Sequence, residues 1–139
     1  MIVLDTNVLS EALRPVPEPS VLDWLANQPR ASLFTTTITR GEILYGIRLL
    51  SDGKRRRGLW DGAKKIFDED FADQVLSFDS DAADMYAEIA TSRRTAGKPL
   101  SQFDAMIVAM ARSRGASLAT RNAKDFEDCG VDVISPWTM

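Results

Sequence analysis

The first five residues of the chain place the strongest constraint on its fold. An uninterrupted apolar run from Met1 to Leu4 precedes the acid Asp5. Because no polar residue alternates with the apolar ones, the run is typical of a strand buried on both faces, as in a parallel sheet. Asp5 would then stand at the carboxyl end of the strand, where open α/β sheets bind their ligands. Alternatively, Asp5 or Thr6 caps a helix that follows, since both residue types are good N-caps.

Further β-rich runs alternate with helical segments along the rest of the chain, which predicts an α/β fold with a mostly parallel sheet and helices on both faces. The expected strands span residues 1–4, 32–36, 75–78, 117–119 and 131–134. The expected helices span residues 8–13, 20–28, about 40–53, 54–67, 79–96 and 101–114, with a short helical turn over 123–128. The helix over 101–114 is apolar on every face and is expected close to the sheet. The pattern does not determine the order of the strands.

The size and composition of the chain are those of one soluble domain spanning residues 1–139. The net charge of −3 does not indicate a nucleic-acid binder, although an acidic chain can carry a local basic patch. No run approaches the roughly 18 apolar residues of a membrane span, and the first residues do not resemble a signal peptide. We therefore expect a cytoplasmic protein with no membrane partner.

The chain contains no histidine and one cysteine, Cys129. The lack of histidine excludes Ser-His-Asp and Cys-His catalysis, the histidine pair of metal-free ribonucleases and histidine-based zinc sites. Cys129 is expected to be a small buried residue, since one cysteine forms no internal disulfide. Any chemistry must therefore use carboxylates, hydroxyls, amides, amines or a metal held by oxygen atoms.

Three acids follow an expected strand end or helix start, namely Asp5, Glu42 and Asp104. Glu42 in TRGE and Asp104 in SQFD also match the capping box, in which the acid merely bonds the N-cap amide. Because parallel topology places strand carboxyl ends and helix amino ends at one edge, the three carboxylates are expected to converge. Helix dipoles offset only about 0.3–1 kcal/mol per charge, so a bound cation is expected. Oxygen ligands favour Mg²⁺ or Mn²⁺.

Such a site predicts hydrolysis of a phosphodiester or phosphate ester, because the ion retains waters, binds phosphate oxygens and acidifies a bound water. A second polar cluster follows the expected strand over 117–119 and contains Thr120, Asn122 and Asp125. Thr120 and Asn122 are candidates for orienting a water or metal ligand, and Asp125 for a further carboxylate. The alternative is helix capping, with Asn122 as N-cap and Asp125 at its third position.

The basic run Lys54–Arg57 begins an expected helix that also contains Trp60. The run fits a solvated surface turn or a contact with RNA or an acidic partner. Trp60 lies on the apolar stripe of that helix, so core packing is favoured over base stacking.

Four segments in fixed order, MIVLDTNVLSE, TITRGEILYGI, LSQFDAMIVAMA and LATRNAKDF, carry a resemblance to a known family. Together with the terminal Pro136-Trp137, the set resembles the PIN-domain ribonucleases and looks most like the VapC/FitB-type toxins of bacterial toxin–antitoxin pairs. The resemblance implies a three-layer α/β/α sandwich and a Mg²⁺- or Mn²⁺-dependent endoribonuclease. By matching positions it makes Asp5, Glu42 and Asp104 the acidic triad.

The resemblance also assigns roles within this site. Asp5 and Asp104 would be the firmest metal ligands and Thr6 a nearby hydroxyl, while Glu42 would order the attacking water or complete the surroundings of the metal. Many relatives carry a fourth acid where this chain has Asn122, whose amide contributes no negative charge. We hypothesise that Asp125 compensates for it.

The partners implied by the resemblance are RNA, a second copy of the chain and a small antitoxin. The C-terminal segment of the antitoxin would occupy the acid-lined groove, often with an arginine toward the acids, while its other end binds DNA as a dimer. Five basic residues are candidate RNA or antitoxin contacts, or ordinary surface charges: Arg40, Arg93, Arg94, Lys98 and Arg121.

Two other functions compete with the ribonuclease. The chain would instead be a binding module with little catalysis, which the missing fourth acid favours. A phosphohydrolase that forms an aspartyl-phosphate fits the position of Asp5 but lacks the second acid two residues on, where the chain has Asn7.

Overall fold

Strand β1 (Ile2–Leu4) is the central strand of a five-stranded sheet in the computed structural model, which describes residues 1–138. Val3 and Leu4 are completely buried and belong to two hydrophobic cores on opposite faces of the sheet. The other strands are β2 (Leu33–Thr36), β3 (Val75–Leu76), β4 (Ser117–Ala119) and β5 (Val133–Ile134). All pairings are parallel in the order β3-β2-β1-β4-β5. The prediction of a parallel sheet from the two-sided burial of β1 is confirmed.

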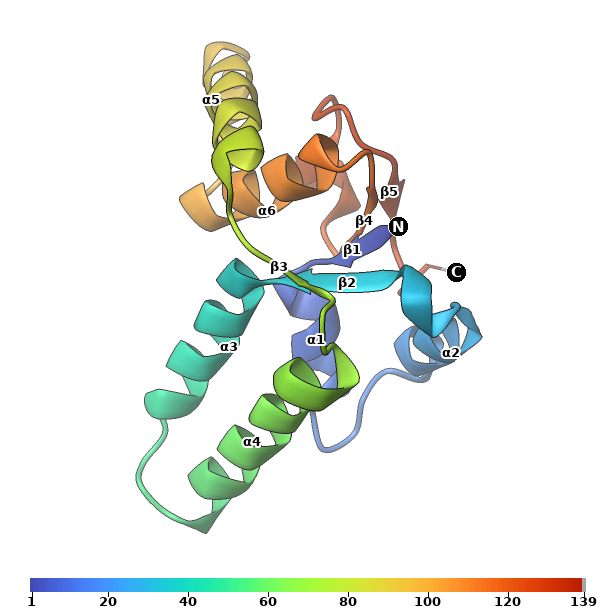
Figure 1. The fold of residues 1–139 in the computed structure, drawn as a ribbon, viewed down its shortest axis with the longest axis vertical. Helices are drawn as coiled ribbons and strands as arrows, with labels where there is room; N and C mark the ends of the chain where they lie inside the picture. Colours follow the sequence, from blue (N-terminus) through green and yellow to red (C-terminus); the bar gives the residue numbers. More distant parts are fainter. Residues whose placement is uncertain (139) are drawn as a thin grey trace.

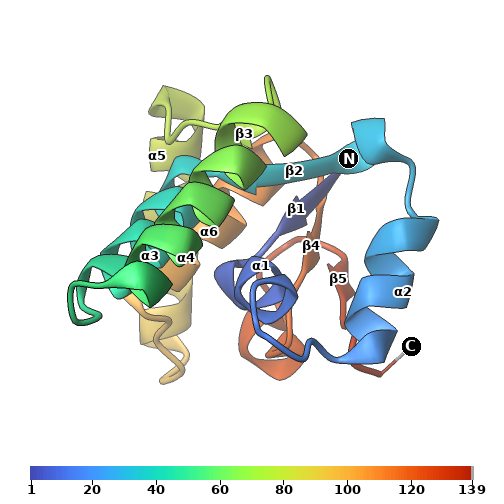
Figure 2. The ribbon, with the colours of Figure 1, turned by 90° about the horizontal axis from the view of Figure 1, so that it is seen from below.

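Helices cover both faces of the sheet and make a three-layer α/β/α sandwich (Figures 1 and 2). Helices α5 (Ser80–Thr95) and α6 (Gln102–Ser113) enclose one core, and α6 lies between α5 and the sheet. The other core lies beneath α1 (Thr6–Ala12), α2 (Pro19–Asn27), α3 (Thr37–Arg48) and α4 (Lys54–Lys65). Three short helical turns complete the chain: η1 (Arg30–Ser32), η2 (Ile66–Asp70) and η3 (Ala123–Phe126). Among residues 1–138, no helix is long and apolar enough to cross a membrane.

Helices α1 and α3 both begin earlier than the sequence predicted. Asp5 accepts a hydrogen bond from the Thr6 amide, so α1 begins at Thr6 rather than at residue 8. The Thr36 hydroxyl accepts one from the Thr39 amide at 3.0 Å, so α3 begins at Thr37 rather than near Arg40. Both helices therefore leave the sheet directly after the preceding strand.

Several element ends are also shorter than the sequence predicted. Helix α3 ends at Arg48 and not near Gly53, which instead precedes the first residue of α4. Strands β3 and β5 have two residues each, although four were expected in both places. These edge strands pair on one side only, so fewer of their residues enter the hydrogen-bonded ladder.

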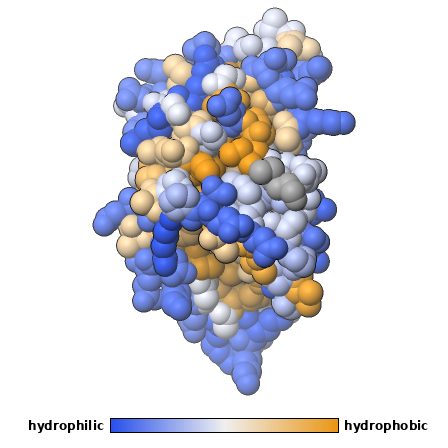
Figure 3. Space-filling model, turned by 90° about the vertical axis from the view of Figure 1, so that its right-hand side faces the viewer, coloured by the Kyte–Doolittle hydropathy of each residue, from blue (hydrophilic) through white to orange (hydrophobic). Residues whose placement is uncertain are grey.

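Three features whose environment was considered from the sequence can be placed in the fold. Cys129 is 2% exposed, and its burial raises the pKa of the thiol, as expected for an unreactive structural cysteine. Trp60 packs against the core beneath α4, with the guanidinium of Arg48 5.5 Å from its ring centre. The basic run Lys54–Arg57 forms the start of α4 at the lower end of the molecule, where hydrophilic side chains cover the surface (Figure 3).

The strand order creates a topological switch point at the centre of the sheet. The chain passes from β1 outward to β2 and β3, and then returns to the opposite side of β1 as β4. In open α/β sheets, ligands bind in the crevice beyond the strand carboxyl ends at this point. Asp5 follows β1 and Thr120 follows β4, so both residues stand at the switch point.

We predict that Leu118→Ala lowers the free energy of unfolding by about 2–5 kcal/mol, because it removes a fully buried side chain from a core that cannot fully collapse. The matched control is Leu22→Ala in α2, where the side chain is 41% exposed and the expected change is about 0.5 kcal/mol or less. Denaturant unfolding of both variants measures the two values. Equal losses would contradict the described position of β4 within the sheet.

Candidate active site

The carboxylate of Asp5 is buried at the end of β1, where the residue is 3% exposed. Oδ1 accepts a hydrogen bond from the backbone N–H of Thr6 at 2.8 Å, which caps α1. Oδ2 accepts one from the hydroxyl of Thr120 at 2.8 Å and a longer one from the side-chain amide of Asn7 at 3.3 Å. The capping alternative for Asp5 is therefore correct, but the cap uses only one of the two carboxylate oxygens.

Burial raises the pKa of Asp5 from its ordinary 3.8 to about 6. The hydrogen bonds from the Thr120 hydroxyl and the Thr6 amide lower the pKa, but they do not offset the loss of water around the carboxylate. Repulsion from the carboxylates of Asp104 and Glu42 raises it further. The fold therefore brings the three acids close enough for their charges to interact, as the strand and helix positions predicted.

Glu42 lies in the second turn of α3 and accepts a hydrogen bond from the side chain of Thr6. The Oε1–Oγ1 distance is 2.8 Å, and the Thr6 hydroxyl is also 3.0 Å from that of Thr39. Because Thr6 uses its proton on Glu42, Thr39 must donate to Thr6. The capping box predicted between Thr39 and Glu42 is wrong, since Thr36 is the N-cap and Glu42 lies too far along the helix.

Asp104 lies in the first turn of α6. The hydroxyl of Ser101 accepts a hydrogen bond from the Asp104 backbone N–H at 3.2 Å, so the predicted cap of this helix is confirmed. Within residues 1–138, the Asp104 carboxylate has no hydrogen-bond or ion-pair partner. It faces an open groove of about 480 Å³ that Lys98, Lys124 and Asp125 also line.

Asn122 and Asp125 are exposed on the loop that follows β4. The backbone N–H of Asn122 donates to the Thr120 hydroxyl at 3.2 Å, which connects this loop to Asp5. The Asn122 side chain makes no capping hydrogen bond, so the capping alternative is wrong for this residue. Asp125 shares the groove with Asp104, whereas Asn122 does not line that groove.

The side chain of Arg93 in α5 holds the loop after β4 in place. Its two terminal nitrogens donate to the backbone carbonyls of Glu127 at 2.9 Å and Asp125 at 3.1 Å. Arg93 is only 8% exposed, so it is not the surface charge that the sequence suggested. Among the other basic candidates, Arg40 pairs with Asp68 at 2.8 Å and Arg121 stacks on Trp137, while Lys98 and Arg94 are exposed.

The carboxylate oxygens of the three acids suit a hard cation such as Mg²⁺ or Mn²⁺. The carboxylates of Asp5, Glu42 and Asp104 offer oxygen ligands, and within the described residues no basic side chain is hydrogen-bonded to any of the three. No three acids among residues 1–138 stand close enough to form a ready-made metal cage. Mg²⁺ typically uses one or two carboxylates and keeps several waters, so Asp5 with one neighbouring acid would be sufficient.

Comparison with known protein families identifies the fold that carries this site. A family profile described as PIN domain matches residues 2–131. The chain belongs to the PIN-domain family. The family that the four sequence segments suggested is therefore confirmed. The matched residues include Asp5, Glu42 and Asp104.

Individual relatives match this PIN domain over nearly its full length. The plasmid stability protein StbB of Pseudomonas syringae pv. tomato is 42% identical over 99% of both chains. The VapC ribonuclease Y4jK of Sinorhizobium fredii is 37% identical over 99% of this chain and 98% of its own. The crystal structure of FitAcB from Neisseria gonorrhoeae is 34% identical, with a TM-score of 0.89 and complete coverage of both chains.

Two polar residues that position the acids were not singled out from the sequence. Thr39 is fully buried and orients the Thr6 hydroxyl toward Glu42. Asn7 donates to Asp5, and its Oδ1 accepts from the backbone N–H of Arg121 at 3.1 Å. The sequence did give a signal for Asn7, because it is a polar residue two positions after the acid at the end of β1. The sequence analysis considered this position only for the second acid that a phosphohydrolase would need.

We predict that burial of Asp5 makes the fold less stable as the pH rises from about 4 to about 6 in the presence of a chelator. The folded chain keeps the Asp5 proton to a higher pH than the unfolded chain does, so the native state binds more protons in this window. The expected loss in the free energy of unfolding is about 3 kcal/mol, because each unit of the rise in the Asp5 pKa corresponds to about 1.4 kcal/mol. Asp5→Asn should not show this loss. The difference in unfolding free energy between parent and variant, measured at several pH values, tests this prediction.

The control for the pH experiment is Asp23→Asn, which changes an exposed acid of α2 in the same way. Its stability profile should follow that of the parent. Parallel profiles for the parent and Asp5→Asn between pH 4 and 6 would contradict the raised pKa of Asp5.

Proposed function

We propose that this PIN domain is the toxin of a toxin–antitoxin pair and that it hydrolyses RNA phosphodiester bonds at Asp5, Glu42 and Asp104. The main support is that the charges of Glu42 and Asp104 act on the buried carboxylate of Asp5, and that none of the three acids has a basic partner among the described residues. The 37% identity to a protein named a VapC ribonuclease supports RNA as the substrate.

The proposed reaction depends on Mg²⁺ or Mn²⁺ held by Asp5 and Asp104, with Glu42 beside them. Such an ion supplies charge stabilisation and acidifies a bound water. Glu42 has one oxygen engaged by the Thr6 hydroxyl, which leaves the other to orient a water or accept its proton. The hydroxyls of Thr6 and Thr39 fix the rotamer of Glu42, so its free oxygen is held in one direction.

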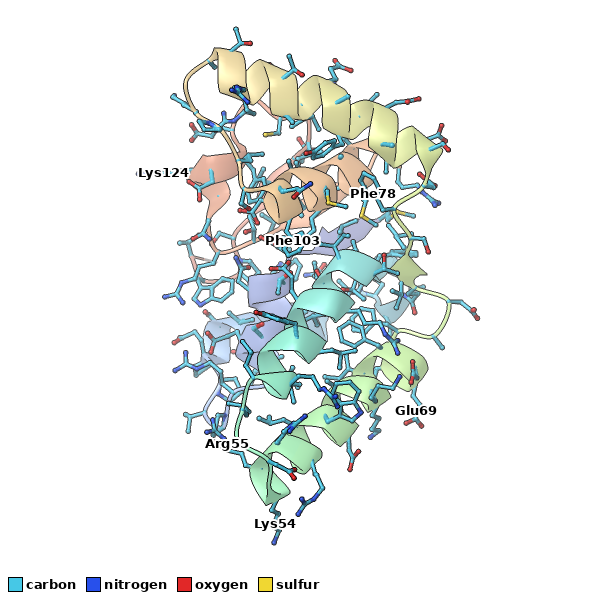
Figure 4. All side chains as sticks on the ribbon, turned by 90° about the vertical axis from the view of Figure 1, so that its left-hand side faces the viewer. Lys54, Arg55, Glu69, Phe78, Phe103 and Lys124 are labelled. Carbon is cyan, nitrogen blue, oxygen red and sulfur yellow. The ribbon has the colours of Figure 1, made fainter. Side chains whose placement is uncertain are left out.

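The protein partners proposed for this chain are an antitoxin and a second copy. A groove of about 490 Å³ begins at Thr6 and Glu42 and continues past the apolar side chains of Ile43, Ile47 and Leu59. We assign the antitoxin segment to this groove because its walls are largely apolar while its end is acidic. The exposed side chains of Tyr45 and Phe103 line a pocket together with Glu42, and Leu49 is exposed at the end of α3. These apolar side chains support a homodimer through α3 and the start of α6, where Phe103 lies (Figure 4).

We predict that purified, antitoxin-free protein cleaves members of a mixed RNA panel with Mg²⁺ or Mn²⁺ and not with a chelator. Asp104→Asn should lower the cleavage rate at least about a hundredfold, as expected for loss of a charged group at a reacting centre. Asp23→Asn makes the same chemical change at an exposed position of α2 and should retain full activity. Gel analysis of the RNA products measures all three rates.

The same experiment separates the ribonuclease from the binding-module alternative. A binding module would leave every RNA intact while Asp104→Asn weakened capture of the antitoxin. That alternative draws its support from Asn122, which contributes no charge at the position where the resemblance implies a fourth acid. Cleavage that survives in Asp104→Asn would also overturn the proposed site.

We predict that Mg²⁺ or Mn²⁺ raises the melting temperature of the parent, because an ion that binds only the folded state stabilises it by mass action. Asp5→Asn should lose most of this increase, whereas Asp23→Asn should keep it.

Asp125→Asn tests whether Asp125 compensates for Asn122. A metal titration curve equal to that of the parent would end the compensation hypothesis, and one shifted to higher metal concentration would support it.

A further inference from the structure

A groove on the Asp104 side of the acids is lined by three acidic residues, Asp104, Asp125 and Glu127, and by three cationic residues. Its volume is about 480 Å³, and it is more polar than the antitoxin groove that begins at Thr6 and Glu42. The cations come from three segments: Arg93 from α5, Lys98 from the connection between α5 and α6, and Lys124 from η3. Arg93 and Lys98 lie five residues apart, whereas Lys124 comes from a distant segment that the tertiary structure brings to the same groove.

The two lysines of this groove are available for a ligand. Lys98 and Lys124 are both exposed, and neither forms an ion pair within the described residues. The backbone N–H of Lys98 donates to the carbonyl of Arg93 at 3.0 Å, which fixes the main chain while the side chain stays in solvent. Lys124 projects from the edge of the molecule (Figure 4).

Arg93 places a third positive charge at the inner wall of the groove. It is 92% buried, since 8% of the residue is exposed, and it pairs with two carbonyls rather than with a carboxylate. Its Nε has no hydrogen-bond partner among residues 1–138. Burial of a guanidinium without an acidic partner is costly, and an anion in the groove would offset that cost. Asp125 and Glu127 also line the groove, but within the described residues neither forms an ion pair with these cations.

We propose that Lys98 and Lys124 bind phosphate groups of a single RNA strand next to the scissile bond, with the buried charge of Arg93 beneath them. The inference rests on the proposed ribonuclease function and extends it to a substrate subsite. Lysines act on phosphates as point charges and read no base. The groove therefore contributes affinity and places the strand beside Asp104, while it does not select a base sequence.

The binding test uses a labelled short single-stranded RNA, Mg²⁺ and an Asp5→Asn background that prevents cleavage. Adding Lys98→Ala and Lys124→Ala should weaken binding roughly tenfold at low salt and reduce the salt slope by about 1.4, at about 0.7 per lost phosphate contact. The charge-matched control adds Lys54→Ala and Lys65→Ala, which are exposed on α4. Lys54 lies at the opposite end of the molecule (Figure 4), so the control should stay within about twofold.

A kinetic test in the parent background distinguishes failure of the subsite from failure of the proposed function. Lys98→Ala/Lys124→Ala should raise KM about as much as it weakens binding and leave kcat within about twofold, as for contacts made equally in ground and transition states. If the parent cleaves RNA and this variant has unchanged KM and affinity, the subsite is wrong and the ribonuclease stands. Equal losses in the Lys54→Ala/Lys65→Ala control would also overturn the subsite. A parent that neither cleaves nor binds RNA would overturn both proposals.

Discussion

The interactions of Asp5 join the centre of the sheet to the candidate site. Its backbone N–H donates to the carbonyl of Ala119 at 2.9 Å and so extends the pairing of β1 with β4. Its carboxylate then bonds Thr120 beyond β4 and the first amide of α1. Asp5 thus connects β1 to β4 at the switch point, caps helix α1 and places a buried carboxylate at the crevice. Changes at Asp5 therefore affect both the fold and the site.

Neutral hydroxyl groups, rather than basic side chains, orient the acids of this site. Thr120 bonds Asp5, and the pair Thr39–Thr6 bonds Glu42, so both carboxylates are held without being neutralised. An arginine in either place would hold the acid equally well but would remove the negative potential that attracts a cation. Threonine hydroxyls therefore preserve the negative charge of the site in the unliganded fold.

Local patterns in the sequence predicted the elements that are marked by a run of apolar residues or by a capping residue close in the chain. The apolar run before Asp5 gave the central strand, the uniformly apolar α6 was expected near the sheet, and Ser101 was identified as its cap. The strand order, the cap of α3 and the burial of Arg93 were not predicted. The strand order and the burial of Arg93 depend on contacts between segments far apart in the chain, since Arg93 bonds carbonyls more than thirty residues away. The cap of α3 is local, from the Thr39 amide to Thr36, but the adjacent Thr37 and Thr39 are of the same residue type and give no local signal for choosing between them.

The same distinction applies to the site, because the three acids could be listed from sequence but their different environments could not. Asp5 is buried and has a raised pKa, Glu42 accepts a hydrogen bond from Thr6, and Asp104 faces the groove that Lys98 and Lys124 also line. The acids consequently stand between two grooves of different character, one largely apolar and one polar with lysines. An antitoxin segment in the apolar groove would meet an RNA strand in the groove of Lys98 and Lys124 only at the acids. Inhibition would then require the antitoxin to reach the acids and would not require it to cover Lys98 or Lys124.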